Sequence, residues 1–277
     1  MKPDTVIKVA DKLSHGHTQF DSDFEVVLAD TEYSRRIHYQ LRYQVYCLEE
    51  GFEDRSQFRD EEERDHWDEQ SVHFLVRARQ SREWVAAMRM VISEHGALPI
   101  EKLCEIDPIV TPSAAGEPIA EISRICIIDG YRRTKSRLDK VIDNTAEGRD
   151  CRPKLAATGI QAGQPGTRIH KSLILKGLLR AAAIYSRDND IPYWYFLTTP
   201  ALARIISRLN VQLIKIGSAC HHRGVRYPFL ANIQDAIRQA RKGCPDMAAM
   251  LGSRVDAYRR FSELEPAQVP ADHCLVA

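Results

Sequence analysis

The chain has 277 residues with 39 basic and 38 acidic side chains, so its net charge of +1 gives no overall attraction to nucleic acid or anionic membranes. Hydrophobic content of 44% and charged content of 28% are ordinary for a soluble globular protein. The sequence shows no apolar run of membrane-spanning length and no apolar segment typical of a signal peptide. The seven cysteines form no Cys-x-x-Cys pair, which argues against a zinc ribbon or a disulfide framework. We therefore expect a cytoplasmic protein without a nucleic-acid partner.

The first half of the chain alternates strand and helix patterns after a polar segment, residues 1–22, which we expect to be flexible. Its predicted elements are a strand at 24–28, a helix at 31–50, a hairpin of strands at 72–79 and 84–92, a short helix at 99–106 and a central strand at 119–128. Residues 53–70 form a charged loop between the first helix and the hairpin.

The second half begins with residues 129–167, whose Gly, Pro and charged residues lack periodicity and predict a flexible insertion. The predicted elements after it are an amphipathic helix at 168–187, a strand at 192–198, a helix at 201–209, strands at 211–216 and 225–230, and two helices within 232–265. This order favours the α/β (α+β) class, with a central mixed sheet flanked by helices. We expect one domain over 23–242, followed by a helical segment and tail over 243–277.

Six charged side chains stand inside or next to these apolar segments, where a charge is costly unless it has a partner or a polar ligand. They are Arg42, Asp65, Asp68, Arg89, Glu121 and Arg124. The three arginines and three carboxylates could pair with each other, or they could face a polar substrate. Tyr46 lies one helical turn after Arg42, so these two side chains could meet the same ligand.

Four short motifs contain these residues in a characteristic order. They are Leu-Arg-Tyr-Gln-Val-Tyr at 41–46, Glu-Arg-Asp-His-Trp-Asp at 63–68, Ala-Met-Arg-Met at 87–90 and Glu-Ile-Ser-Arg at 121–124. With them, residues 25–128 resemble the autoinducer synthases, which make N-acyl-homoserine lactones, and equally the N-acyl amino acid synthases. Residues 173–217 are most similar to the acyltransferases found beside exosortase (PEP-CTERM) sorting systems. The resemblance implies the GNAT acyltransferase fold.

The resemblance also implies an N-acyl transfer, with Glu121 and Arg124 as catalytic residues. An amine must lose a proton before it attacks a thioester, and Glu121 is our candidate for the base. The alternative is a salt bridge from Glu121 to a neighbouring arginine. Arg124 is three residues further on, so on a regular strand it faces away from Glu121. Either the strand is distorted, or Arg124 orders the acidic loop, which is the charged segment of residues 53–70. The alternative to a functional role is a purely structural ion pair between Arg124 and Asp65 or Asp68.

The predicted substrate-binding residues come from the same four motifs as Glu121 and Arg124. They are Arg42, Tyr46, Asp65, Asp68, Arg89 and Ser123. The arginines could hold a substrate carboxylate or pair with the aspartates, and the aspartates could hold the amine of the acceptor. Trp67 and Phe52 are candidates for the pocket wall, with a core position as the alternative. Ser123 has no Ser-His-Asp context, so we expect no serine nucleophile.

The usual GNAT phosphate loop is missing, because Gly163 and Gly166 lack its spacing. This weakens coenzyme A as the donor and favours acyl-phosphopantetheine on an acyl carrier protein. Basic residues near the insertion would attract that acidic partner, and Arg168 and Lys171 are the predicted donor contacts; a solvated loop is the alternative. We expect no tightly bound cofactor and no metal. Peripheral membrane contact through the insertion stays open.

Together these observations predict an N-acyltransferase that moves a fatty acyl group from acyl carrier protein to the amine of an amino acid or related acceptor. One alternative is an acyl-homoserine lactone synthase that uses S-adenosylmethionine. Tyr46 disfavours this alternative, because the lactone synthases usually have Phe at that position. The insertion and the second half of the chain also disfavour it. The other alternative is a GNAT-like sensor of acyl ligands without catalysis, which the joint presence of Arg42, Arg89 and Glu121 disfavours.

Overall fold

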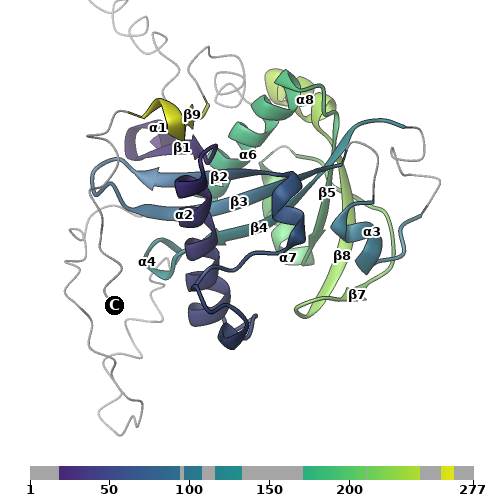
Figure 1. The fold of residues 1–277 in the computed structure, drawn as a ribbon. Helices are drawn as coiled ribbons and strands as arrows, with labels where there is room; N and C mark the ends of the chain where they lie inside the picture. The colour runs from purple at the N-terminus through teal and green to yellow at the C-terminus, as the bar shows by residue number, and fades with distance from the viewer. Residues whose placement is uncertain are drawn as a thin grey trace, which may run out of the picture.

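The computed structural model describes residues 19–93, 97–107, 116–132, 171–209, 211–243 and 257–264. In this part of the chain nine strands form a central sheet with helices on its faces (Figure 1). The strands are β1 (Phe24–Leu28), β2 (Ser71–Ala78), β3 (Trp84–Ser93), β4 (Ile119–Ile127), β5 (Tyr193–Thr198), β6 (Ile214–Lys215), β7 (Cys220–His221), β8 (Val225–Asn232) and β9 (Arg259–Arg260).

The α-helices are α1 (Gln19–Asp23), α2 (Glu32–Tyr43), α3 (Pro99–Leu103), α4 (Asp129–Arg132), α6 (Lys171–Asp188), α7 (Pro200–Arg208) and α8 (Ile233–Gly243). Shorter turns are the π-helical η2 (Gln44–Glu49) and the 3-10 helices η3 (Arg55–Gln57), η4 (His66–Gln70) and η7 (Phe261–Glu263). None of the helices in the described ranges combines the length and the apolar composition of a membrane-spanning segment.

The strands follow the order β6-β8-β5-β4-β3-β2-β1-β9, and β7 pairs with β8. Two neighbouring pairs, β4 with β5 and β1 with β9, are parallel, and the other pairs are antiparallel. The expected mixed α/β sheet flanked by helices is therefore confirmed.

Adjacent residues of β2 show how two helices sandwich the sheet, because successive side chains of a strand point to opposite faces. His73 contacts His38 of α2, with 4.6 Å between ring centroids. Phe74 contacts Tyr185 of α6, with 6.0 Å between ring centroids. Figure 1 shows α2 in front of the strands and α6 behind them. The apolar core lies mainly between α6 and the sheet, whereas the α2 side also holds charged groups.

The parallel strands β4 and β5 diverge at the middle of the sheet. They pair only from Ile119 to Ile122 against Tyr193 to Phe196, whereas β4 continues to Ile127. Opposite β3, the register of β4 shifts between the pairs Ala87–Cys126 and Arg89–Ser123, so β4 carries an extra residue there. The pairing with β5 ends at Ile122, next to this bulge, and beyond that point an opening lies between the two strands.

The N-terminal boundary differs from the expected flexible segment 1–22, of which residues 1–18 lie outside the described part. Residues 19–23 form α1, and the side chain of Phe20 is only 2% exposed. It packs so closely on α6 that a Cβ added to Gly177 would lie 2.2 Å from the Phe20 ring. Asp21 also accepts hydrogen bonds from Arg180 at 2.8 and 2.9 Å. A single buried ring, which periodicity does not reveal, makes this segment part of the core.

Other boundaries shift for similar reasons. The strand expected at 211–216 is reduced to β6, and the second helix expected before residue 265 is wrong at 259–263, where β9 pairs with β1 and η7 comes next. Only α4 of the expected insertion 129–167 lies in the described part, and residues 244–256 and the tail after 264 lie outside it. Two-residue strands have no periodic signal of their own, because tertiary pairing alone defines them.

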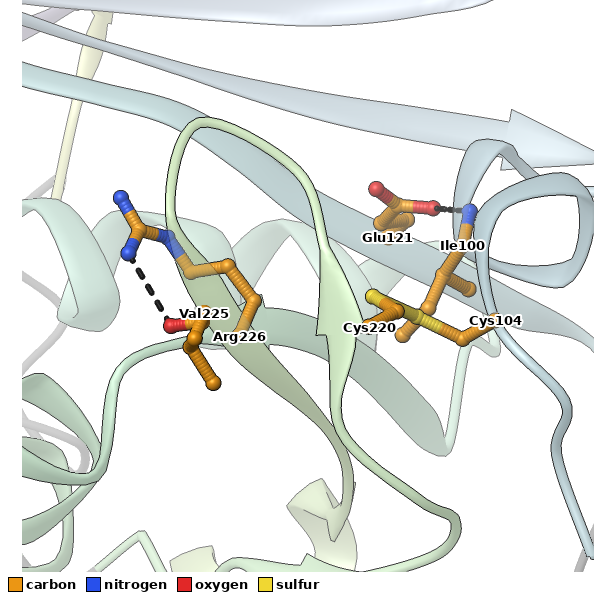
Figure 2. Close-up of a disulfide and its surroundings, with 6 residues drawn as sticks. All are labelled: Ile100, Cys104, Glu121, Cys220, Val225 and Arg226. Atoms are coloured by element: carbon orange, nitrogen blue, oxygen red, sulfur yellow. Dashed lines mark hydrogen bonds between the residues drawn. A yellow bond between two sulfur atoms is a disulfide. The ribbon is translucent and has the colours of Figure 1, made fainter.

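The cysteine pattern argued against a disulfide framework and did not predict the one disulfide bond that the described residues contain. Cys104, at the end of α3, bonds to Cys220 of β7, with 5.7 Å between their Cα atoms (Figure 2). The same segments pair through a bridge between Ile106 and Gly217, where the backbones approach so closely that a Cβ on Gly217 would lie 2.3 Å from a carbonyl oxygen. The partners are 116 residues apart in sequence, so cysteine spacing carried no signal of the bond.

Candidate active site

A cavity of about 670 Å³ occupies the opening between β4 and β5. Its wall includes most of the residues expected at the site: Tyr46, Phe52, Asp65, Trp67, Arg89, Glu121, Ser123, Arg124 and Lys171. Arg42 and Asp68 do not line it; they lie directly behind the wall, and both are buried. Arg168 lies outside the described residues. Apolar side chains of β4, β5, α6 and α7, such as Leu175 and Phe196, line another part of the cavity.

Glu121 is a buried carboxyl group that faces this cavity. It pairs with Val91 of β3, and Glu121 as a whole is only 3% exposed. The backbone N–H of Ile100 in α3 donates a 2.7 Å hydrogen bond to Oε2 of Glu121 (Figure 2). No cationic side chain among the described residues forms an ion pair with it, which argues against the salt-bridge alternative. Burial raises the pKa of Glu121 to about 7, although the Ile100 N–H and the charges of Arg89 and Arg124 oppose this shift.

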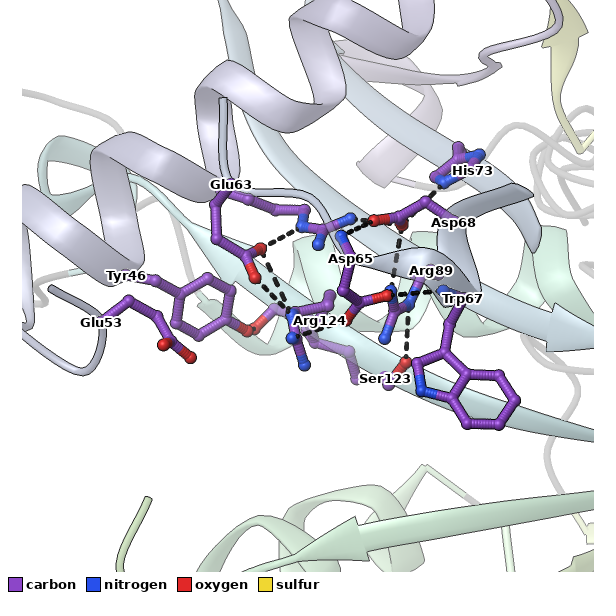
Figure 3. A network of polar contacts seen from close by, with 12 residues as sticks. Tyr46, Glu53, Glu63, Asp65, Trp67, Asp68, His73, Arg89, Ser123 and Arg124 are labelled. Carbon is purple, nitrogen blue, oxygen red and sulfur yellow. Dashed lines mark hydrogen bonds and ion pairs between the residues drawn. The ribbon is translucent and has the colours of Figure 1, made fainter. Parts of the chain in front are cut away.

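The three arginines form a closed ring of alternating charge with Glu63, Asp65 and Asp68, next to Glu121 (Figure 3). Arg42 donates to Glu63 at 2.5 Å and to Asp68 at 2.6 Å. Arg89 donates to Asp68 at 3.0 Å and to Asp65 at 2.6 Å. Arg124 closes the ring through Asp65 at 2.9 Å and Glu63 at 3.1 Å. Each charge in the ring therefore has two opposite neighbours, which offsets the cost of removing it from water.

The ring keeps its carboxyl groups ionised. Burial raises the pKa of Glu63, but Arg42 and Arg124 outweigh it, and the pKa lies below the ordinary value. The same holds for Asp65, where Arg89 and then Arg124 oppose burial. The carboxyl groups of the ring thus remain charged at neutral pH, whereas Glu121 titrates there.

The pKa of Asp68 is shifted furthest down, because a hydrogen bond with His73 and the charges of Arg42 and Arg89 outweigh its burial. The ring nitrogen Nε2 of His73 lies 3.2 Å from Oδ1 of Asp68. Asp68 also caps η4 together with Asp65, since its carboxylate accepts from the backbone N–H of Asp65 at 2.7 Å. The carboxylate of Asp68 therefore joins the start of η4 to His73 of β2.

Glu63 is the ring member that sequence reasoning missed. It belongs to the acidic motif, but only the tertiary structure shows that it joins Arg42 to Arg124. The side chain is 2% exposed, as deeply buried as a core residue. Its position at the start of the Glu-x-Asp-x-x-Asp motif was the available signal.

Arg124 combines the two explanations that the sequence left open. The strand is distorted, because Arg124 lies in the bulge of β4 and has a left-handed backbone with φ of +51°. Arg124 also orders the acidic loop, through Glu63 and Asp65; Asp68 is not among its partners. A non-glycine residue in this conformation is strained, and such strain is maintained where the surroundings over-determine it. In this site the ring supplies that support.

Tyr46 lies between two arginines at another side of the cavity. The Cζ atoms of Arg124 and Arg223 are 5.9 and 5.6 Å from its ring centroid. Its hydroxyl donates to the carbonyl of Ile125 at 3.2 Å, and burial raises its pKa above the ordinary value. Arg223 comes from the turn between β7 and β8, has a φ of +50°, and pairs with Glu53.

Sequence reasoning also missed the contribution of this turn, because His222, Arg223 and Arg226 reach the cavity only through the folding of β7 onto β8. At this turn His221 is exposed and His222 is half-buried. Burial and the charge of Arg223 lower the pKa of His222 to about 4, so its imidazole is neutral at neutral pH.

Comparison with known proteins identifies the fold to which this architecture belongs. Residues 41–138 match the family model described as an acetyltransferase (GNAT) domain. The solved structure of TofI in a ternary complex with an inhibitor and MTA is 14% identical, covers 88% of this chain and 100% of its own, and has a TM-score of 0.50. The fold is that of the GNAT acetyltransferases. No curated protein matches the chain in sequence.

BjaI, a CoA-dependent acyl-homoserine lactone synthase with SAM and isopentyl-CoA, shares the GNAT fold at 12% identity, 86% and 92% coverage and a TM-score of 0.50. FeeM, an N-acyl amino acid synthase from uncultured soil microbes, is 10% identical over 78% of this chain and 95% of its own, with a TM-score of 0.48. The expected GNAT fold and the resemblance to the autoinducer synthases are confirmed at the level of the fold.

Proposed function

We propose that this chain is an N-acyltransferase that moves a fatty acyl group from a thioester to the amine of a small acceptor. The observation that carries the proposal is the state of Glu121. It is a buried carboxyl group at the wall of a large cavity, without a cationic partner among the described residues, and with a pKa of about 7. A base with this pKa can both take and release a proton near neutral pH.

In the proposed reaction the carboxylate of Glu121 takes one proton from the ammonium form of the acceptor. The neutral amine then attacks the carbonyl carbon of the thioester, which forms the C–N bond. When the C–S bond breaks, the nitrogen loses a second proton. One of the two protons completes the leaving thiol, and the other goes to solvent. Arg124 contributes by fixing the bulge of β4 and the acidic loop beside Glu121.

The donor we propose is acyl-phosphopantetheine on an acyl carrier protein. Lys171, at the start of α6, lines the cavity and would meet the acidic surface of such a carrier. The apolar side chains along β5, α6 and α7 would accept the fatty chain. Acyl-coenzyme A is the other donor to be tested. The association with an exosortase system and a cytoplasmic location remain predictions.

An acyl-homoserine lactone synthase is the second candidate function. The likeness in fold to TofI and BjaI favours it. The two candidates share the acyl transfer and differ in the next step, because a lactone synthase closes a ring on its acylated acceptor. The product therefore separates them.

The test is mass spectrometry of lipids from cells that express the wild type, Glu121→Gln or the control Glu69→Gln. Glu69 is exposed on η4 and does not line the cavity. We expect a new N-acyl amino acid with the wild type and the control, and none with Glu121→Gln. A new acyl lactone would identify the second candidate. Absence of both products, with all three proteins folded and donors supplied, would refute the acyltransferase proposal.

A further inference from the structure

Lys102 is a cation at the cavity wall that is not engaged by any carboxylate of the described residues. Its Nζ lies 4.5 Å from the ring centroid of Trp67, and both residues line the cavity. Among the described residues, none with an acidic side chain forms an ion pair with Lys102. Arg89, Arg124 and Arg223 also line the cavity, but each is paired with a carboxylate. The ammonium group of Lys102 is thus available to a ligand.

Lys102 also lies on the element that holds the proposed base. It belongs to α3, two residues after Ile100, whose N–H binds Glu121 (Figure 2). In the register of β3 and β4, Val91 faces Glu121 and Arg89 faces Ser123, so Glu121 and Ser123 point to the same face.

Trp67 reaches this face from η4. Figure 3 shows its indole ring beside Arg89 and Ser123. The indole ring of Trp67 thus lies on the same face as Glu121, and the ammonium group of Lys102 lies over this ring.

We propose that Lys102, which lies over Trp67, binds the carboxylate of the acceptor. The acceptor is then an amino acid with a free carboxylate and not an amine that lacks a carboxylate. This inference rests on the proposed function. The amine must reach Glu121, and in an α-amino acid one carbon separates the amine from the carboxylate. An ionised Glu121 repels that carboxylate, so binding requires a nearby cation. The flexible stem of a lysine can bring its ammonium to the anion, and the indole face stabilises that ammonium.

Two further cations of the cavity wall form no ion pair with a described residue: Lys171, which we assign to the donor, and Arg226, which is the rival for this role. Arg226 belongs to β8, on the hairpin wall. Its Nη1 donates to the carbonyl of the neighbouring Val225 at 3.2 Å, so the guanidinium is turned back on its own hairpin.

The experiment compares free amino acids with their α-amides, each as a pool of the twenty common side chains, with palmitoyl groups on acyl carrier protein and on coenzyme A as donors. The variants are Lys102→Met, Lys102→Arg, Arg226→Met and the control Lys215→Met. Lys215 also lies over an aromatic ring, 4.4 Å from the centroid of Tyr227, but it does not line the cavity.

We expect Lys102→Met to raise KM for the free amino acids about tenfold or more, with little change in kcat and in KM for the amides. Lys102→Arg should retain most of the preference, and Lys215→Met all of it. If Lys102→Met leaves the preference for free acids intact, or if Arg226→Met removes it instead, the inference is wrong while the acyltransferase proposal stands. If the wild type uses acids and amides equally, the inference is also wrong and the acyltransferase proposal still stands.

If the wild type acylates neither pool, the proposed function fails, and binding then decides the inference. Tryptophan fluorescence is titrated with the same pools in the wild type, Lys102→Met and Lys215→Met. A change that requires the free carboxylate and disappears only in Lys102→Met would uphold an anion site. No carboxylate-dependent change in the wild type would overturn it.

Discussion

The backbone N–H of Ile100 holds Oε2 of Glu121 at 2.7 Å, so a short helix inserted between β3 and β4 positions the candidate base. The bond stabilises the ionised form, yet burial outweighs it and raises the pKa of Glu121 to about 7. The balance between one hydrogen bond and burial therefore decides which fraction of the molecules carries an ionised base at neutral pH.

The first prediction concerns activity against pH. The carboxylate of Glu121 is the active form, so kcat/KM should rise with pH and level off above about 7. Glu121→Gln should lose this dependence together with most of the activity, whereas Glu69→Gln should keep the wild-type profile. Initial rates between about pH 5.5 and 8.5, which span the raised pKa, measure it. A flat wild-type profile would remove Glu121 from the role of base.

The second prediction concerns stability against pH. The pKa of Glu121 is raised above its ordinary value of 4.5, so the folded chain binds a proton more tightly than the unfolded chain. This contribution to stability is complete below 4.5 and is lost as pH rises to about 7, by roughly 3 kcal/mol in total.

Glu121→Gln can still accept the Ile100 N–H but carries no charge. It should therefore raise the melting temperature at about pH 8 by several degrees and change it little at about pH 4.5. Thermal unfolding at the two pH values measures the difference. A variant that is less stable than the wild type at the higher pH contradicts the burial of this charge.

The third prediction compares two arginines of the charged ring. Arg42→Met should destabilise the fold by about 3–5 kcal/mol, because it leaves the buried Glu63 and Asp68 each short of a partner. Arg124→Gln should cost much less stability, since Glu63 keeps Arg42 and Asp65 keeps Arg89. Activity of Arg124→Gln should nevertheless fall about 100-fold, because the wall beside Glu121 moves.

Urea unfolding and initial rates of the two variants provide this comparison. Equal losses of stability would mean that the ring does not depend on the deeper arginine. Full activity of Arg124→Gln would show that the bulge of β4 positions nothing that the reaction needs.

The fourth prediction concerns the bond between Cys104 and Cys220. In the chain-entropy model, a cross-link between residues 116 apart stabilises the fold by about 4–5 kcal/mol. Under oxidising conditions, Cys104→Ser should therefore melt well below the wild type. A reductant should lower the wild type to the level of the variant and leave the variant unchanged. A wild type that a reductant does not affect, with the cysteines found as free thiols, would refute the bond.

The fifth prediction tests the docking of α1. A Cβ at Gly177 would overlap the ring of Phe20, so Gly177→Ala should destabilise the fold by about 1–3 kcal/mol despite the better helix propensity of Ala. Gly130 is also helical, but a Cβ added there would have no other atom within 4 Å, so Gly130→Ala should be neutral or slightly stabilising. Urea unfolding measures both. Gly177→Ala as stable as the wild type would mean that α1 does not pack on α6.

Local sequence patterns determined the principal elements of this protein. Alternation and apolar runs predicted β1, the β2–β3 hairpin, β4 and β5, and helical periodicity predicted α2, α6 and α7. These signals are reliable because each long element buries a face of its own, and the period of its side chains shows that face. Through the resemblance that they carry, four short motifs in a fixed order likewise predicted the GNAT fold. Most of the site residues predicted from these motifs line the cavity, although they are a minority of all its lining residues.

Only the tertiary structure decided how those residues act. The two-residue strand β9, the bond between Cys104 and Cys220, and the place of Glu63 in the ring depend on contacts between segments far apart in the chain. The bulge at Arg124 has no local signature, since any residue can be forced into a left-handed backbone when its surroundings hold it there. The pKa of Glu121 is the clearest case, because burial sets it, and burial is a property of the whole fold.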